Sequence, residues 1–209
     1  MVFGFPGRTT EYLIYEANKQ QIEVLNPVRI SLRDKTLKIL DKYMRADEKT
    51  KIQYASKYAG IANSWKKWIG ENLGMKVSKG LDKKLKADLE FQKRVNQNPK
   101  FEAYRKLIPD MEFLYKRLEP FAKAREYYAE TFVRNVDVYD YYQLVKSLIN
   151  TYEGRGEAKF NLSKQDILKN IDAYFKDFNT SIDQEIFASL LEQFITEMNP
   201  AFVFNSLKE

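Results

Sequence analysis

Apolar residues recur every three or four positions along most of this chain, which is the spacing of one face of an α-helix. One clear example carries Leu32, Leu37, Leu40 and Met44; another carries Ile186, Leu190, Leu191, Phe194, Ile195 and Met198. Glycine and proline, which interrupt helices, number only 8 and 6 in 209 residues. The pattern predicts an all-α protein, an irregular bundle of about seven or eight helices.

Polar caps and prolines set the expected boundaries in the first half of the chain. The Asn26-Pro27 pair should end one helix and begin the next, since Asn caps helices and Pro suits the first turn. Asp47 should cap a third helix that ends between Gly70 and Gly74. A charged fourth helix is expected over about residues 78–95.

Breakers are sparser in the second half. Pro109 and Pro120 are expected to kink or split the helical stretch that restarts at Asn98-Pro99. The run Gly154-Arg155-Gly156 predicts a loop. The last helix should begin near Ser181 or Asp183 and end at Asn199-Pro200.

The first eight residues differ from the rest. Val2 to Phe5 is a short apolar run, and Pro6-Gly7 is a turn signal, so we expect a β-strand end and a tight turn. A lone strand leaves its backbone groups without partners. We therefore expect residues 1–8 to be a remnant of another domain and residues 9–209 to form one helical domain.

Composition removes several kinds of chemistry. The chain has no His and no Cys, which excludes a Ser-His-Asp triad, a thiolate nucleophile, Cys/His zinc sites and Glu-x-x-His di-iron sites. No phosphate-binding glycine loop is present either. From these absences together we predict no catalytic residue, metal ligand or cofactor in this chain. No apolar run is long enough to span a membrane, and the start lacks the basic leader of a signal peptide.

Three polar or aromatic segments have both a functional and a structural interpretation. Asp137 and Asp140, near Tyr139 and Tyr141, could do carboxylate chemistry, although a solvated helix face explains them more simply. The lysine-rich segment 65–86 with its two tryptophans suggests a nucleic-acid surface or an ordinary exposed helix. The tyrosines of residues 127–152 suit a groove wall, an interface or a helix seam.

The sharpest segment is residues 54–68. Ala55, Ala59 and Ala62 lie on one stripe of the expected helix with Gly60 alongside, so another backbone could approach closely. Asn63 follows. Asparagine is a poor former of helix interiors, so its place here needs a reason. Its amide could make a buried hydrogen bond between helices or contact a ligand.

Two blocks of sequence resemble one family. Residues 2–13 read VFGFPGRTTEYL, and residues 52–68 run from IQYAS to NSWKKW. Both are similar in order and separation to blocks of the bacterial serine dipeptidyl-peptidases of the dipeptidyl-peptidase 7 and 11 type. The similarity is strong over about the first 74 residues and looser beyond.

The resemblance implies a chymotrypsin-like β-barrel that carries the catalytic triad, with a helical cap domain inserted in it. Residues 1–8 would be a remnant of a barrel strand, and the triad residues would lie outside this chain. It also implies release of dipeptides from peptides with a free N-terminus, with Asn63 helping to hold the substrate's α-amino group. The expected partners are this peptide and the flanking barrel; the parent could form a homodimer.

The resemblance further implies a periplasmic, secreted or cell-surface location. The alternative is a stand-alone helical interaction or nucleic-acid-binding module, against which the two blocks and the strand-like start both argue.

Overall fold

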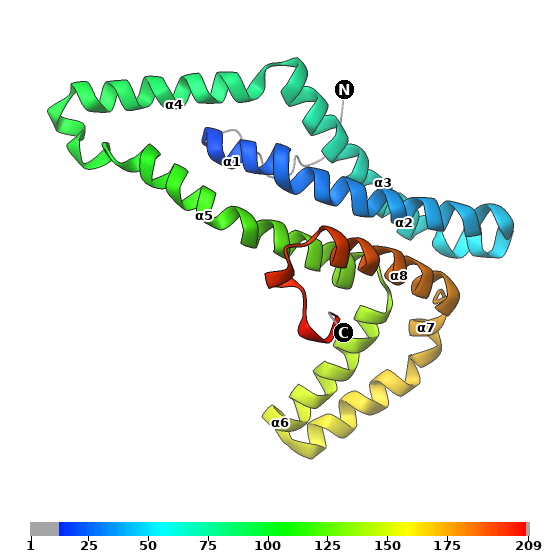
Figure 1. Ribbon diagram of the computed structural model, residues 1–209. Coiled ribbons are helices and arrows are strands. Elements are labelled where there is room, and N and C mark those ends of the chain that lie inside the picture. The colour runs from blue at the N-terminus through cyan, green and yellow to red at the C-terminus, as the bar shows by residue number, and fades with distance from the viewer. Residues whose placement is uncertain (1–12, 208–209) are drawn as a thin grey trace, which may run out of the picture. The chain divides into compact units, whose positions relative to one another are not determined.

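The computed structural model describes residues 13–207, and this part of the chain is helical with no β-strand. The all-α prediction is confirmed, whereas the expected strand at residues 1–8 lies outside the described residues. The α-helices are α1 (Tyr15–Lys19), α2 (Asn26–Ala46), α3 (Glu48–Val77), α4 (Gly80–Gln97), α5 (Leu107–Tyr128), α6 (Val138–Lys169), α7 (Ile171–Phe175) and α8 (Thr180–Glu197) (Figure 1).

Shorter helical segments join them. Two are π-helices, η1 (Gln20–Leu25) and η3 (Ala129–Arg134), and three are 3₁₀-helices, η2 (Pro99–Tyr104), η4 (Pro200–Phe202) and η5 (Asn205–Leu207). The chain divides into two compact units. Unit 1 takes the residues up to Pro27 and Ile69–Ala122, and unit 2 takes Val28–Trp68 and Lys123–Glu209.

Unit 2 contains a continuous apolar core. Most of the predicted apolar face near α8 is buried, with Ile186 and Leu190 fully covered and Phe194 and Met198 nearly so, whereas Ile195 is exposed. Residues of α2 and α3 complete the core, among them Leu32, Leu40, Tyr54 and Ile61. The C-terminal segment packs here too, since Val203 is buried and the Phe204 ring lies 5.8 Å from that of Phe132.

A buried charge network lies beside this core. Glu130 on η3 is completely buried and accepts hydrogen bonds from Arg33 at 2.8 Å and Arg134 at 2.8 Å. Burial alone would raise the pKa of Glu126, but hydrogen bonds from Arg29 and Arg134 outweigh it and lower that pKa to about 2. Both carboxylates of this network are thus paired with arginines, as burial of charge requires.

Polar contacts hold much of unit 1. The Tyr15 N–H donates to Asp88 at 2.7 Å, joining the start of α1 to α4. The Asn26 amide donates to Asn72 at 2.9 Å, and Asn72 donates to the carbonyl of Ile22 at 3.2 Å. Few apolar side chains of the described part of unit 1 are buried, and these are Ala17, Leu25, Val95 and Ala122.

The chain does not break at Asn26-Pro27 as predicted, and Pro109 and Pro120 do not split α5. Asn26 does not cap a new helix, because its side chain bonds residues of α3 and Gln21, and η1 continues directly into α2. Pro27 lacks the N–H that an α-helix needs at that point, and the wider π-helical turn before it accommodates the loss. Pro120 lies inside α5 without splitting it, and Pro109 falls in the first turn, where no N–H is required.

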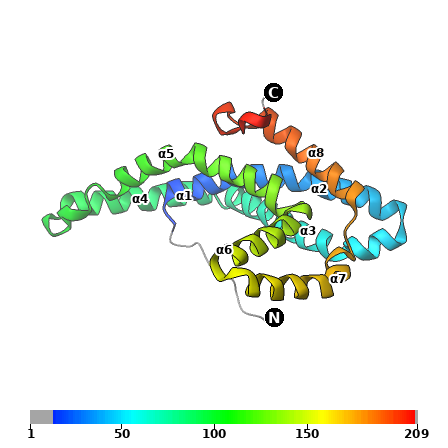
Figure 2. The same ribbon diagram turned by 90° about the horizontal axis from the view of Figure 1, so that it is seen from below.

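One break was missed and one was confirmed. The chain leaves the helix at Asn135, whose buried amide donates to the Glu130 carbonyl at 2.7 Å, before α6 begins. The expected loop at residues 154–156 is present as a reversal inside α6, where Gly156 adopts φ 77° and ψ 175° (Figures 1 and 2). The two halves of α6 contact through Tyr152 and Phe160, with ring centroids 5.6 Å apart.

Candidate functional site

Helix α3 is the element that carries the sharpest sequence block. Asp47 caps it as predicted, accepting hydrogen bonds from the backbone N–H and the hydroxyl of Thr50, each at 2.7 Å. Tyr54, Ile61 and Ala62 turn one face of α3 into the core of unit 2. Because that face is fixed by packing, the opposite face is held in a defined orientation toward solvent.

Asn63 lies on the solvent side. It is exposed, and within the described part of the chain its side chain has no hydrogen-bond partner. The interpretation of Asn63 as a buried bond between helices is therefore wrong. An asparagine exposed in a helix interior keeps both its carbonyl oxygen and its NH₂ group available to a ligand.

Small residues surround Asn63 on the same surface. Ala55, Ala59 and Gly60 are exposed, whereas Ala62 belongs to the core. A methyl group placed on Gly60 would meet no atom within 4 Å. The exposed stripe thus offers the α3 backbone to close approach by another chain.

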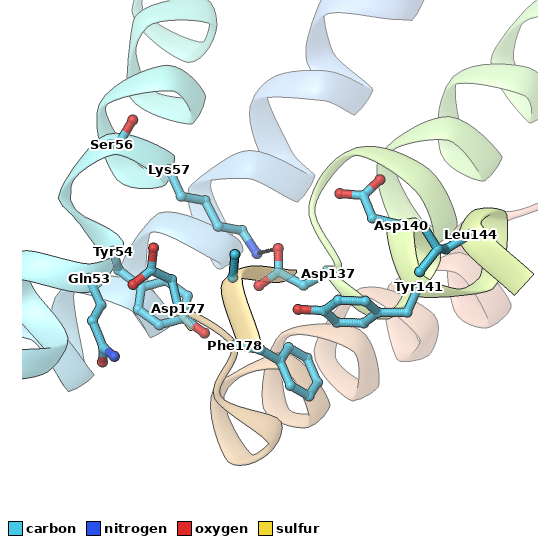
Figure 3. Close-up of a pocket in the computed structure, with 11 residues that line it drawn as sticks. Gln53, Tyr54, Ser56, Lys57, Asp137, Asp140, Tyr141, Leu144, Asp177 and Phe178 are labelled. Carbon is cyan, nitrogen blue, oxygen red and sulfur yellow. Dashed lines mark hydrogen bonds and ion pairs between the residues drawn. The ribbon is translucent and has the colours of Figure 1, made fainter. Parts of the chain in front are cut away.

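A cavity of about 410 Å³ opens beside the first half of α3. It lies within unit 2, between α3, the start of α6 and the α7 region (Figure 3). Its lining residues are Gln53, Tyr54, Ser56, Lys57, Asp137, Asp140, Tyr141, Leu144, Ala173, Asp177 and Phe178. Ser56 and Asn63 are seven residues apart on one helix, so they share a face and lie about 10 Å apart along its axis.

An ion pair closes one side of the cavity. The Lys57 ammonium lies 2.7 Å from an Asp137 carboxylate oxygen (Figure 3). Asp183 supports the wall from behind: its buried carboxylate accepts the backbone N–H groups of Asp137 at 2.6 Å and Val138 at 3.1 Å. Burial raises the pKa of Asp183 even though these two N–H groups act to lower it.

Two tyrosines contribute hydroxyls to the lining. Burial raises the pKa of Tyr54 to about 12, and its oxygen accepts the Asn179 N–H at 3.0 Å. The pKa of Tyr141 is raised by burial first and then by the surrounding carboxylates of Asp137, Asp183, Asp140 and Asp177. Both phenols stay protonated at neutral pH, so the cavity offers ionic and hydrogen-bonding recognition.

The structure separates the other sequence candidates. Asp137 and Asp140 do not lie on a plain solvated face, because the cavity brings both together with Lys57 and Asp177. Sequence spacing could not reveal this, since Lys57 and Asp137 are 80 residues apart. The tyrosines of residues 127–152 lie in different environments: Tyr127 is in the core, Tyr141 lines the cavity, and Tyr142 is exposed.

The tryptophans do not form an open stacking surface. Trp65 packs against the core of unit 2, and the Trp68 ring lies under the guanidinium groups of Arg29 and Arg33 at 5.2 and 4.6 Å. The nucleic-acid interpretation of this segment therefore loses its aromatic contacts. Among residues 13–207, no group of acidic side chains could hold a metal ion, and no helix is long and apolar enough to cross a membrane.

Curated relatives of this chain are peptidases. An Asp/Glu-specific dipeptidyl-peptidase of Flavobacterium psychrophilum is 39% identical over 99% of this chain and 29% of its own length. A second protein of that name, from Capnocytophaga gingivalis, is 38% identical over 100% of this chain and 29% of its own length. Dipeptidyl-peptidase 7 of Phocaeicola vulgatus is 28% identical over 96% of this chain and 28% of its own length. The chain thus spans under a third of the length of these relatives.

A solved structure shares the fold. The crystal structure of Porphyromonas endodontalis DPP11 in complex with the dipeptide Arg-Glu superposes with a TM-score of 0.71, at 21% identity, over 95% of this chain and 28% of that one. The family model described as Peptidase S46 matches residues 1–208. The chain belongs to the peptidase S46 family.

Proposed function

We propose that residues 9–209 form the helical cap domain of a serine dipeptidyl-peptidase that releases dipeptides from the free N-terminus of peptides. Membership of the S46 family and the dipeptidyl-peptidase relatives support this proposal. The chain has no histidine, so the catalytic serine and histidine would be supplied by a flanking β-barrel of the parent protein.

Within this proposal Asn63 binds the α-ammonium group of the substrate. The observation that carries it is the exposed amide of Asn63, which has no hydrogen-bond partner among residues 13–207 and lies on a helix whose opposite face is packed. The amide oxygen can accept a hydrogen bond from the ammonium, and a bond to a charged group is stronger than a neutral one. The small side chains of Ala55, Ala59 and Gly60 would let the peptide backbone reach α3.

Such a contact would explain dipeptide release. An amine held at a fixed distance from the scissile bond places the second peptide bond, and no other, at the nucleophile. The cap would position the substrate, while the barrel would supply the residues that cleave the peptide bond.

The parent is further proposed to cleave after Asp or Glu. The two relatives that carry Asp/Glu-specific in their names are 39% and 38% identical to this chain, against 28% for dipeptidyl-peptidase 7 of P. vulgatus. From the family resemblance we also propose that the parent is periplasmic, secreted or located at the cell surface.

The test is made in the longer protein that contains this chain. Asn63→Ala should lower kcat/KM for a fluorogenic Leu-Asp substrate with a free amine by about 10- to 100-fold, since a hydrogen bond to a charged group is lost. The matched control is Asn161→Ala, which removes another exposed helical asparagine and should leave kcat/KM unchanged.

The substrate provides a second control. Blocking its α-amine with an acetyl group should abolish the difference between the wild type and Asn63→Ala, because the contact is then absent in both. An unchanged kcat/KM of Asn63→Ala on the free-amine substrate would remove Asn63 from the site. A preference for Leu-Leu over Leu-Asp substrates would contradict the proposed acidic specificity.

A further inference from the structure

The cavity beside α3 has a strong local charge that the proposed peptidase function does not use. Asp137, Asp140 and Asp177 line it, while Lys57 is its only cationic lining residue in the part of the chain that the structure describes. The whole chain, in contrast, carries a net charge of +6. An acidic cavity in a basic protein concentrates cations from solution.

Lys57 shows how this cavity holds a cation. Its ammonium pairs with Asp137 at 2.7 Å and lies 5.7 Å from the centroid of the Tyr54 ring. The internal cation is therefore stabilised by one carboxylate and one aromatic face together. Asp140 and Asp177 are exposed and pair with no described cation, which leaves two carboxylates for a second one.

Aromatic rings supply the matching surface. Tyr141 lines the cavity and stacks on Phe175 with ring centroids 4.5 Å apart, while Phe178 meets Tyr141 edge-on at 5.0 Å. The Tyr141 ring is thus held in place by two neighbours. Its hydroxyl is directed toward the Lys57–Asp137 pair (Figure 3). A rigid ring beside carboxylates suits a flat cation better than a compact one, because guanidinium both stacks on rings and bonds carboxylates in its plane.

We propose that the cavity lined by Lys57, Asp140, Tyr141 and Asp177 binds a guanidinium group. The chemistry is shared by an arginine side chain of a polypeptide and by a small guanidinium compound. The cavity volume of about 410 Å³ accommodates either one. This site is separate from Asn63 and does not rest on the proposed peptidase activity.

The test titrates the 209-residue chain with agmatine and follows binding by calorimetry and by NMR shifts of α3 and α7 amides. Saturable binding in the millimolar range is expected for so small a ligand. Cadaverine, which has ammonium groups only, should bind more weakly. Equal binding of cadaverine and agmatine would overturn the guanidinium assignment.

Two variants change the affinity in opposite directions. Asp140→Asn with Asp177→Asn should weaken agmatine binding by about five- to tenfold, because two exposed charge contacts are lost. Lys57→Met frees Asp137 and removes a like charge, so it should tighten binding by about threefold. A structural role alone would not produce tightening, and thermal melts verify that each variant is folded.

The control pair is Glu157→Gln with Asp166→Asn, which changes the net charge equally at exposed positions outside the cavity. Weakening by this pair to the same extent as by the cavity pair would overturn the proposal. In the longer protein, loss of agmatine binding identifies an arginine of the parent as the occupant. Retained binding, with competition by a blocked Gly-Arg-Gly peptide, identifies an external ligand.

Discussion

Unit 1 and unit 2 have the same secondary structure and are stabilised differently. In unit 2, large apolar side chains from α2, α3 and α8 are buried in one core. In the described part of unit 1, large side chains such as Leu89, Phe113 and Phe121 are more than half exposed, and polar bonds such as those of Asn26 and Asn72 join the helices. The same helical periodicity therefore gives a self-sufficient core in one unit only.

The difference matters for where function can be built. A site that must hold its geometry needs supporting residues that cannot move apart. Asn63 and the acidic cavity both belong to unit 2. The exposed apolar residues of unit 1 instead leave much of its hydrophobic surface in water, so we expect its helices to open more easily.

The largest effect should come from the buried charge network. Glu130→Ala leaves Arg33 without its buried partner, which costs about 3–5 kcal/mol of unfolding free energy. Glu112→Ala in unit 1 breaks an exposed, solvent-screened pair with Lys116 and should leave the unfolding free energy nearly unchanged. Urea unfolding measures both. Equal losses of unfolding free energy in the two variants would contradict the proposed difference between the units.

A matched leucine pair tests apolar packing directly. Leu190→Ala removes a fully buried side chain from unit 2 and should cost about 2–5 kcal/mol. Leu89→Ala removes a side chain that is 62% exposed in unit 1 and should change stability by about 0.5 kcal/mol or less. Hydrogen exchange of the two variants then shows whether protection is lost in unit 2 alone, which is the pattern that we expect.

Acid should act on unit 2 through Glu126. Its folded-state pKa of about 2 lies below the usual 4.5, so the stabilising charge is fully present above pH 4.5 and is lost as pH falls toward 2. A shift of this size corresponds to about 3 kcal/mol. Unfolding free energy measured between pH 5 and 2 should therefore fall less steeply in Glu126→Gln than in the wild type. An identical slope would mean that Glu126 is not the acid-sensitive group.

The smallest effects should come from helix ends, with opposite signs in the two units. Asp47→Ala removes the cap of α3 and should lower the Tm, because the hydrogen bonds from Thr50 are lost. Lys79 precedes α4 in the left-handed conformation, with φ 50°, which is unfavourable for a side chain. Lys79→Gly should therefore stabilise by up to about 1 kcal/mol. A Tm shift of the opposite sign for either variant would contradict the assignment.

Regular periodicity was enough to predict the helices. The helical spacing of apolar residues predicts α8 and its buried face, which includes Ile186, Leu190 and Phe194. Asp47 likewise identifies the start of α3, since a cap acts on its own next turn. Local patterns predict structure wherever the deciding contacts are local.

Long-range contacts account for what the sequence did not reveal. Asn26 has the features of a cap, but its side chain bonds Asn72, 46 residues away, and the chain continues through it from η1 into α2. Ser181 or Asp183 was expected to open α8, but the helix begins at Thr180 with Asn179 as its cap, and the Asp183 carboxylate instead bonds the start of α6. The acidic cavity combines residues from three helical regions, so no single segment could predict it. The proposed role of Asn63 came from the family resemblance, and its exposure to solvent was seen only in the structure.

Gly156 has an evolutionary consequence. Its combination of φ 77° and ψ 175° is open to glycine and strained for every other residue, whereas Gly154, two positions earlier, has no such conformation and no neighbour in its way. The two glycines look equivalent in the sequence, but their conformations place different constraints on them. We therefore expect position 154 to vary among related proteins, and position 156 to retain its glycine for as long as the α6 hairpin keeps its present length.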